Sequence, residues 1–384
     1  MKRATGILLA LLLTLPMLPH PARAAGLEVA GKSAVLMDAA TGTVLYENNP
    51  HEKLAPASVT KVMTMLLIME AVDSGKLSLD DTVTASEEAA AKGGSQIYLK
   101  VGESMPARDM LKSIAVSSAN DCACAMAEHL AGSEGAFVER MNRRAEELGM
   151  NDTHFVNCTG LDDGADAAQH RTSAYDIALM SRELLVKHPD IKKFTSIWMD
   201  TVRDGAFGLS NTNKLIRFYS GATGLKTGYT SGAGYCLSAT AEREGMELIA
   251  VVMACETSQK RAAACRSMLD YGFANFSVIS PKLEEAAQVP VILGTADSVP
   301  LTLACGESIL IDKGQKNSIS YEVTPEPSVK APVVKGQTLG SLTVKAGDQV
   351  LKTIPLVASE DVDRLTWGNL FLIVLRRAAM GKTV

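Results

Sequence analysis

Three short motifs in this chain carry side chains that can together perform nucleophilic acyl transfer. In chain order they are Ser58 with Lys61, Ser118 with Asn120, and Lys226 with Thr227 and Gly228. The first supplies a hydroxyl and an amine, the second a further hydroxyl and an amide, and the third a cation beside a hydroxyl. Each pattern is common alone, so their occurrence in order within one chain is the informative signal.

Ser58 and Lys61 have the spacing of a nucleophile and its base. A serine hydroxyl is a poor nucleophile until a base takes its proton. Pro56 predicts a helix start just before Ser58, and a separation of three residues then puts Lys61 on the same helix face. A lysine acts as a base when burial or a nearby positive charge, here Lys226, lowers its pKa. A polar surface face is the alternative, but the apolar run 62–69 favours a buried Lys61.

Ser118 and Asn120 fall between two segments with helical patterns, 108–116 and 121–130. A loop at this point can aim both side chains into a cleft. We expect Ser118 to pass a proton between Lys61 and the leaving group, and Asn120 to bind a substrate amide. Helix capping is the alternative role for both residues.

Lys226, Thr227 and Gly228 open a strand-rich stretch. Lysine and threonine suit a substrate carboxylate, one by charge and one by a hydrogen bond, and glycine lets a ligand approach a strand closely. A peptide substrate can then add as an extra strand. We expect the backbone N–H groups of Tyr229 and Ser58 to form an oxyanion hole. An ordinary turn is the alternative for this segment.

Hydrophobic periodicity predicts the elements that position these residues. Strands are expected at 34–37, 43–46, 235–241 and 247–254, and helices at 108–116, 121–130, 137–148, 173–187 and 258–273. A further helix begins at Pro56 and ends near Gly75. The order of strands, helices, strands and a closing helix predicts one sheet with helices on its faces.

Residues 281–358 form a second predicted domain. Short strand-like runs recur there about every ten residues between Pro and Gly turns, which is typical of a small all-β domain. No charged or nucleophilic cluster stands out in it. We therefore interpret this domain as a spacer or docking module.

Both ends of the chain carry segments that indicate a membrane. Residues 1–24 have the basic start, apolar centre and Ala-Arg-Ala cleavage site of a signal peptide, which predicts export, with an uncleaved anchor as the alternative. Residues 359–384 combine Trp367, an apolar block and two arginines, which predicts an amphipathic helix on a membrane surface. Packing of this helix on the β-domain is the alternative.

Composition argues against several functional classes. The net charge of −5 over 384 residues gives no reason to expect nucleic-acid binding. The histidines lack metal-ligand spacing and no Cys-x-x-Cys pair occurs, so we expect no metal or other cofactor. Seven cysteines leave at least one free thiol in a monomer, and we interpret them mostly as small buried hydrophobes.

The chain resembles the serine-type D-Ala-D-Ala carboxypeptidases, the low-molecular-mass penicillin-binding proteins of the peptidase S11 type. The resemblance runs from about residue 34 to about 273 and includes segments 56–61, 94–103, 118–121, 127–132, 148–155 and 224–230. It implies an α/β (α+β) fold. A β-lactamase/transpeptidase-like catalytic domain with an antiparallel sheet and a helical subdomain would occupy 25–280, followed by the small all-β domain.

The resemblance also implies an activity, the removal of the terminal D-alanine from peptidoglycan stem pentapeptides. Ser58 would carry the acyl group, Lys61 would accept its proton, Ser118 would be the second active-site hydroxyl and Lys226 would bind the substrate carboxylate. β-Lactam antibiotics would bind covalently to Ser58. The implied location is the outer face of the cytoplasmic membrane, where peptidoglycan lies.

A β-lactamase and a non-enzymatic penicillin-binding sensor are the alternatives. No Glu-x-x-Leu-Asn segment lies between the second and third motifs to activate a deacylating water, and a β-lactamase needs no C-terminal β-domain. Intact Ser58, Lys61 and Ser118 argue against an inactive sensor. We therefore expect a carboxypeptidase.

Overall fold

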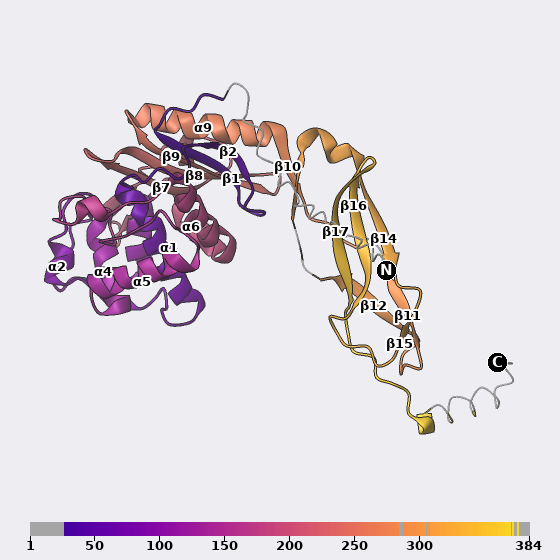
Figure 1. The fold of residues 1–384 in the computed structure, drawn as a ribbon. Coiled ribbons are helices and arrows are strands. Elements are labelled where there is room, and N and C mark those ends of the chain that lie inside the picture. The colour runs from indigo at the N-terminus through magenta and orange to yellow at the C-terminus, as the bar shows by residue number, and fades with distance from the viewer. Residues whose placement is uncertain are drawn as a thin grey trace, which may run out of the picture.

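The computed structural model describes residues 27–283, 287–304, 306, 308–369, 371 and 375. The predicted signal peptide, residues 1–24, lies outside the described residues, as do residues 370, 372–374 and 376–384 of the predicted C-terminal tail. The described chain forms two lobes, a larger one of sheet and helices and a slender one of strands (Figure 1).

The larger lobe is built on a five-stranded sheet in the order β2-β1-β9-β8-β7, with every neighbouring pair antiparallel. Its strands are β1 (Ser33–Asp38), β2 (Val44–Asn48), β7 (Ala222–Thr230), β8 (Gly234–Arg243) and β9 (Met246–Cys255). The first and last strands of this lobe therefore share one sheet, which confirms the predicted fold class. Because β7 is an edge strand, one of its sides is open to a further strand.

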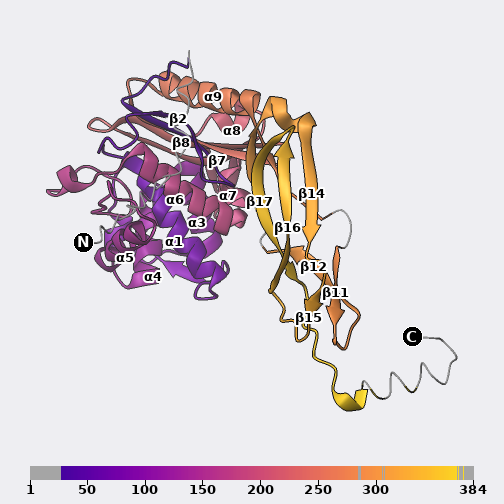
Figure 2. The same cartoon turned by 45° about the vertical axis from the view of Figure 1, so that its right-hand side comes forward.

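The alternation of side chains along β9 explains how both faces of the sheet are covered. Ile249, Val251 and Met253 belong to the core under the helical layer, whereas Leu248 and Val252 belong to the core on the other face. The helix α9 (Ser258–Asn275) covers that second face, as Figures 1 and 2 show. Because both faces of the sheet are covered, its central strand β9 is apolar on both sides.

The helical layer contains the four long helices that periodicity predicts between residues 107 and 187, and their predicted type is confirmed. The helices of this layer are α1 (Lys61–Asp73), α2 (Glu87–Ala90), α3 (Ala107–Ser117), α4 (Asn120–Ala131), α5 (Glu134–Glu147) and α6 (Ala174–Lys187). Serines accept capping bonds at three helix starts: Ser86 Oγ from the Ala89 N–H, Ser133 Oγ from the Ala136 N–H and Ser173 Oγ from the Asp176 N–H.

Several short elements of this lobe were not predicted because they are too brief for a periodic signal. They are η2 (Ala167–Gln169), η3 (Pro189–Ile191), α7 (Lys192–Thr195), α8 (Leu215–Phe218), and the two-stranded ribbons β3 (Thr82–Thr84) with β4 (Ser104–Pro106) and β5 (Met199–Val202) with β6 (Phe207–Ser210). The helix predicted from Pro56 to about Gly75 is observed as η1 (Ala57–Thr60) followed directly by α1.

The slender lobe is a six-stranded sheet in the order β14-β16-β17-β12-β11-β15, which confirms an all-β domain. Its strands are β11 (Gln288–Ile292), β12 (Ser298–Leu303), β14 (Ile319–Pro325), β15 (Val329–Lys330), β16 (Thr338–Ala346) and β17 (Gln349–Ala358), with η4 (Lys313–Ser318) before β14. Another strand of the predicted region 281–358 lies outside this sheet: β13 (Ile309–Asp312) pairs with β10 (Phe276–Ile279), which directly follows α9.

The six cysteines of the described chain are all buried and unpaired. Several pack in the apolar clusters, such as Cys122 in the helical layer and Cys265 against the sheet. Their interpretation as small buried hydrophobes agrees with these positions. Cys305 lies outside the described residues.

The segment 157–161 is held tightly against η1 and the first turn of α1. The Asn157 carboxamide oxygen accepts the N–H groups of Thr159 at 3.1 Å and of Gly160 at 2.6 Å. Gly160 has φ +81°, and a β-carbon added to it would lie 1.8 Å from the Ala57 carbonyl oxygen. No other residue type fits this position without moving the backbone.

We therefore expect Gly160→Ala to lower the free energy of unfolding by on the order of 3 kcal/mol, since it adds both a clash and left-handed strain. Gly164→Ala is the matched control, because no atom lies within 4 Å of its β-carbon position and its φ is not positive. Urea unfolding of both variants measures the difference. Equal stability of the two variants would show that segment 157–161 is loosely held.

Candidate active site

The first motif forms a direct contact at the start of the helical layer. Ser58 is half-buried in η1, and Lys61 is the first residue of α1. Lys61 Nζ lies 3.1 Å from Ser58 Oγ and donates a second hydrogen bond, of 2.8 Å, to the Thr159 carbonyl oxygen. The amine is thus aimed at the hydroxyl from a fixed position, which is the geometry that proton transfer requires.

The environment of Lys61 lowers its basicity. Its side chain is fully buried beneath the apolar residues of α1. Burial lowers the pKa of Lys61 from 10.5 to about 7, although the nearby Cys158 and Asp121 act in the opposite direction. A substantial fraction of Lys61 is therefore neutral near pH 7 and able to accept a proton.

Lys226 is the second buried amine of this cleft. Burial, followed by the positive charges of Lys61 and Arg261, holds the pKa of Lys226 well below its usual value. Its Nζ donates to the Thr227 carbonyl oxygen at 2.9 Å, and Thr227 Oγ1 donates to Thr212 Oγ1 at 2.7 Å. An anion bound here would favour the protonated form of Lys226.

Ser118 and Asn120 lie where α3 passes into α4, close to the predicted interhelical loop, although Asn120 is already the first residue of α4. Ser118 has a left-handed backbone with φ 64°. Its hydroxyl and the Asn120 carboxamide oxygen are buried without a hydrogen-bond partner among the described residues. A buried polar atom without a hydrogen-bond partner lowers the free energy of unfolding by roughly 1–3 kcal/mol. The two atoms therefore offer unused bonding capacity to a ligand.

Gly228 brings strand β7 into contact with the nucleophile segment. A β-carbon added to Gly228 would lie 2.6 Å from the Pro56 carbonyl oxygen and 3.1 Å from the Ser58 nitrogen. The glycine is required for this close approach, as predicted for a strand rather than a turn. The strand begins earlier than predicted, at Ala222, so Lys226 stands in the middle of β7.

Tyr229 continues β7 beyond this close approach. Its side chain is 54% exposed and packs on the ring of Tyr235, with ring centroids 4.2 Å apart. Tyr229 directly follows the glycine that touches the Ser58 backbone, which is the position expected of an oxyanion-hole donor.

The structure thus joins Ser58 to Lys61 directly and brings β7 against them. It does not join every member of the three motifs: the Ser118 hydroxyl is bonded to neither Lys61 nor Lys226. A link between the second and third motifs runs through Thr212, whose N–H donates to the Val116 carbonyl oxygen near the end of α3. A ligand bound between α3 and β7 would connect the side chains of all three motifs.

Two residues that contribute to the site, Thr159 and Arg261, could not be identified from the sequence. Thr159 positions Lys61 through its backbone carbonyl, which any residue type possesses. Arg261, on α9, donates from Nη1 to the carbonyl oxygens of Gly228 at 3.1 Å and Cys236 at 3.2 Å, while its Nε is buried without a partner in the described chain. Only a three-dimensional structure identifies such contacts.

Comparisons with known proteins agree with this geometry. A family model described as D-alanyl-D-alanine carboxypeptidase, peptidase S11, matches residues 20–257, and one described as penicillin-binding protein 5, C-terminal domain, matches residues 276–364. The chain is 46% identical over 339 residues to the D-alanyl-D-alanine carboxypeptidase DacF of Bacillus subtilis, which covers 87% of this chain and 86% of that protein.

Solved structures show the same relationship. Penicillin binding protein 5 from Haemophilus influenzae aligns with a TM-score of 0.74 and 30% identity over 88% of this chain and 98% of its own. Penicillin-binding protein D2 from Listeria monocytogenes, solved in an ampicillin-bound form, aligns with a TM-score of 0.59 and 32% identity over 64% of this chain and 99% of its own. The fold and cleft are those of a penicillin-recognising serine enzyme. The chain belongs to the peptidase S11 family of D-alanyl-D-alanine carboxypeptidases.

The lowered pKa of Lys61 predicts the pH dependence of acylation. Neutral Lys61 can accept the Ser58 proton and protonated Lys61 cannot, so the rate constant for acylation by a fluorescent penicillin should rise through about pH 7 and level off above about pH 8. Stopped-flow fluorescence measures it. Lys61→Arg, which stays protonated, should show no such rise and almost no labelling. A flat profile in the unsubstituted protein would exclude Lys61 as the base.

Proposed function

We propose that this chain is a serine-type D-alanyl-D-alanine carboxypeptidase that removes the terminal D-alanine from peptidoglycan stem pentapeptides. The observation that carries the proposal is the 3.1 Å contact between Ser58 and a Lys61 whose pKa burial lowers to about 7. Membership of the S11 family supports the same activity.

In the proposed reaction Ser58 Oγ attacks the carbonyl carbon of the penultimate D-alanine while its proton passes to Lys61 Nζ. The N–H groups of Ser58 and Tyr229 stabilise the oxyanion. The tetrahedral adduct then collapses, the C–N bond breaks, and the proton returns through Ser118 to the departing amine of D-alanine. Water attacks the resulting ester and frees Ser58.

The same residues explain substrate binding. Lys226 and Thr227 bind the terminal carboxylate, whose charge restores the protonated state of Lys226. Asn120 binds a backbone amide through its unpartnered carboxamide oxygen. The peptide lies along the open edge of β7, where Gly228 leaves room for it. A β-lactam acylates Ser58 in the same way, and its leaving nitrogen stays attached to the acyl group.

The chain is proposed to act outside the cytoplasmic membrane. Residues 1–24 direct export, 25–280 form the catalytic domain, 281–358 the β-rich domain and 359–384 a membrane-associating tail. Support for the tail comes from Trp367, Phe371 and Leu375, which share a helical spacing of four and are 88%, 67% and 49% exposed.

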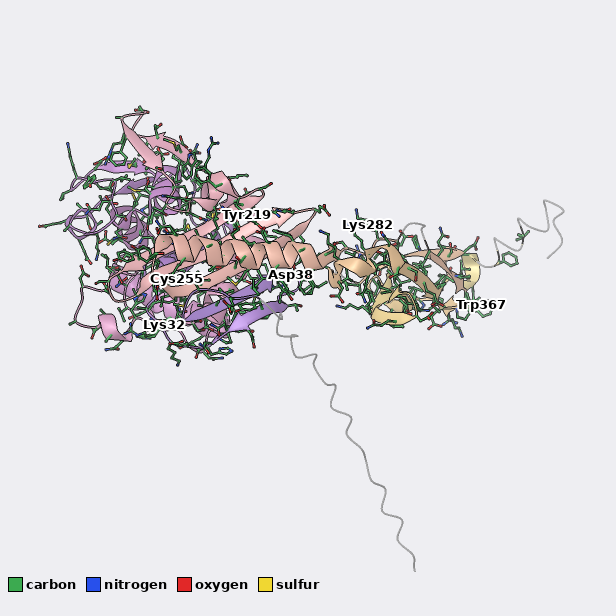
Figure 3. The ribbon with its side chains drawn as sticks, turned by 90° about the horizontal axis from the view of Figure 1, so that it is seen from above. Lys32, Asp38, Tyr219, Cys255, Lys282 and Trp367 are labelled. Carbon is green, nitrogen blue, oxygen red and sulfur yellow. The ribbon has the colours of Figure 1, made fainter. Side chains whose placement is uncertain are left out.

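Trp367 lies at the end of the slender lobe remote from the larger one (Figure 3). In the described chain no helix is long and apolar enough to cross a membrane. Attachment through one interfacial face would hold the catalytic lobe at a distance from the membrane, separated from it by the β-rich lobe.

Replacement of the nucleophile tests the activity. Ser58→Ala should abolish both D-alanine release from a pentapeptide ending in D-Ala-D-Ala and covalent labelling by fluorescent penicillin, because no other group in the proposed reaction forms the ester. Coupled D-alanine detection and gel fluorescence measure the two effects, with penicillin hydrolysis followed in parallel. Retained turnover in Ser58→Ala would refute the proposal. Rapid penicillin hydrolysis without D-alanine release by the unsubstituted protein would indicate a β-lactamase.

Removal of the exposed face tests the membrane tail. The triple variant Trp367→Ser, Phe371→Ser, Leu375→Ser should lose sedimentation with anionic phosphatidylglycerol vesicles, since the apolar contact with the acyl chains is gone. The control Tyr321→Ser, Val323→Ser, Val350→Ser removes three exposed apolar side chains from the β-rich lobe and should sediment normally. Unchanged sedimentation of the tail variant would exclude the tail as the anchor.

A further inference from the structure

A cavity of about 340 Å³ adjoins the proposed active site without including its catalytic side chains. It is an open pocket bordered by the loop after α2 and by the segment 156–167, and its lining includes Lys92, Gly93, Asn157, Thr159, Asp163 and Asp166. Two of these residues also touch the site: Thr159 accepts the Lys61 bond and the Gly93 carbonyl oxygen accepts from Asn120 Nδ2 at 2.7 Å. The cavity therefore borders residues that contact Lys61 and Asn120.

The direction of the substrate follows from the edge strand. A peptide whose carboxylate is bound by Lys226 and Thr227 and which pairs antiparallel with β7 extends its preceding residues toward Thr230 and the following turn. That turn lies against the loop that lines the cavity, because a β-carbon on Gly232 would be 3.1 Å from Asp162 Oδ2. The acyl side of the scissile bond therefore faces the cavity and the leaving D-alanine faces away from it.

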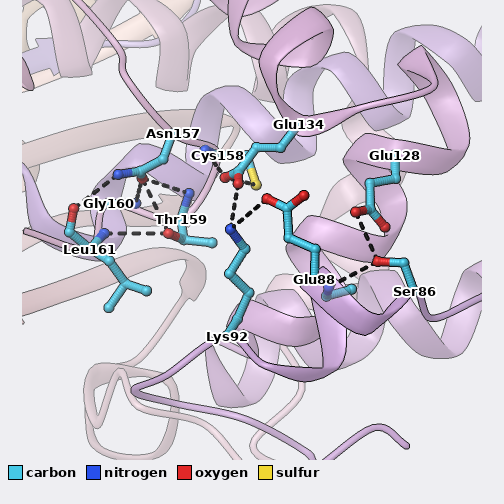
Figure 4. Close-up of polar contacts among 11 residues, drawn as sticks. Ser86, Glu88, Lys92, Glu128, Glu134, Asn157, Cys158, Thr159, Gly160 and Leu161 are labelled. Carbon is cyan, nitrogen blue, oxygen red and sulfur yellow. Dashed lines mark hydrogen bonds and ion pairs between the residues drawn. The ribbon is translucent and has the colours of Figure 1, made fainter. Parts of the chain in front are cut away.

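The charge of the cavity is negative, although a lysine lines it. Lys92 Nζ lies 2.5 Å from Glu134 and 3.2 Å from Glu88, so two carboxylates neutralise it (Figure 4). These carboxylates raise the pKa of Lys92 against the opposing effect of its partial burial. The charge of Lys92 is thus already paired within the protein and does not make the cavity positive.

Two further carboxylates have no such cation. Asp163 makes no hydrogen bond or ion pair with any residue the structure describes. The Asp166 carboxylate accepts one neutral bond, from Gln169 Nε2 at 3.2 Å. Both side chains are exposed, and a cation entering the cavity would gain their attraction with little competition.

We propose that this cavity binds the ammonium group at the end of the side chain of the residue that precedes the D-Ala-D-Ala unit. The inference rests on the proposed carboxypeptidase function, which places that residue on the acyl side of Ser58. A side chain long enough to cross from β7 to the loop would place its ammonium between Asp163 and Asp166. The cavity thus selects among stem peptides by the charge of this one residue.

Two synthetic substrates test the inference in the full mature protein. They are Nα-acetyl-L-lysyl-D-alanyl-D-alanine, with a free ammonium, and its Nε-acetylated counterpart, which is neutral at the same place. We expect kcat/KM for D-alanine release to favour the free ammonium by on the order of fivefold at low salt, the upper range for exposed ion pairs, and less at high salt.

Variants connect this preference to the cavity. Asp163→Asn with Asp166→Asn should bring the ratio of the two kcat/KM values close to one, while turnover of the neutral peptide stays within about twofold of the unsubstituted protein. Asp297→Asn with Asp348→Asn is the control, since it removes the same charge from exposed turns of the β-rich lobe and should leave the ratio unchanged.

The outcomes separate the two proposals. If neither peptide releases D-alanine, the proposed function fails. If both are hydrolysed with equal kcat/KM, or if the preference survives in the Asp163/Asp166 double variant, the function stands and the ammonium site is wrong. A preference for an Nε-succinylated peptide, which carries a carboxylate, would likewise overturn the inference and assign the cavity to Lys92.

Discussion

The burial of two lysine side chains in one cleft is the constraint on which the rest of this structure depends. Lowering the pKa of Lys61 from 10.5 to about 7 corresponds to on the order of 5 kcal/mol of disfavoured protonation in the folded state. The folded-state pKa lies below the unfolded one, so this cost is absent above about pH 10.5 and grows as the pH falls toward 7. The helix that begins at Lys61 offsets it with a continuous apolar surface, since Val62, Met65 and Leu66 are fully buried. The activation proposed for Ser58 thus comes at the expense of folding stability.

Close backbone approach is what keeps water away from these amines. Gly160 and Gly228 both lie against the Pro56–Ser58 backbone, one from the helical layer and one from the sheet, at distances that a β-carbon would prevent. Left-handed backbones at Ala57 and Ser118, with φ of 48° and 64°, add strain of the kind found at functional sites. The unpartnered oxygens of Ser118 and Asn120 belong to the same pattern, because a cleft prepared for a substrate leaves some polar atoms unsatisfied until it arrives.

The sequence predicted those parts of the molecule whose signal is local. The helices α3 to α6 and the strands β8 and β9 have strong periodicity, and Ser58 with Lys61 has a helical spacing that leaves little freedom. The contacts of Lys61 with Thr159 and of Arg261 with Gly228 could not be predicted, because a backbone carbonyl carries no residue signature and the partners are 98 and 33 positions apart. The pairing of β10 with β13 was missed for a related reason: four residues after a long helix give no period to detect.

Thr159 connects the chemistry of the cleft with the selection of its substrate. Its carbonyl oxygen fixes Lys61 Nζ, while the same residue lines the cavity beside Asp163 and Asp166. The Asn157 side chain makes hydrogen bonds to the backbone of Thr159, Gly160 and Leu161. The backbone that contacts Lys61 Nζ therefore does not depend on the exposed carboxylates. Residues 163–166 can therefore differ in charge without displacing Lys61. Residues 157–161 are thus fixed, whereas residues 163–166 can vary. This division would let one acyl-transfer site accept peptides with different side chains next to the scissile D-Ala-D-Ala unit.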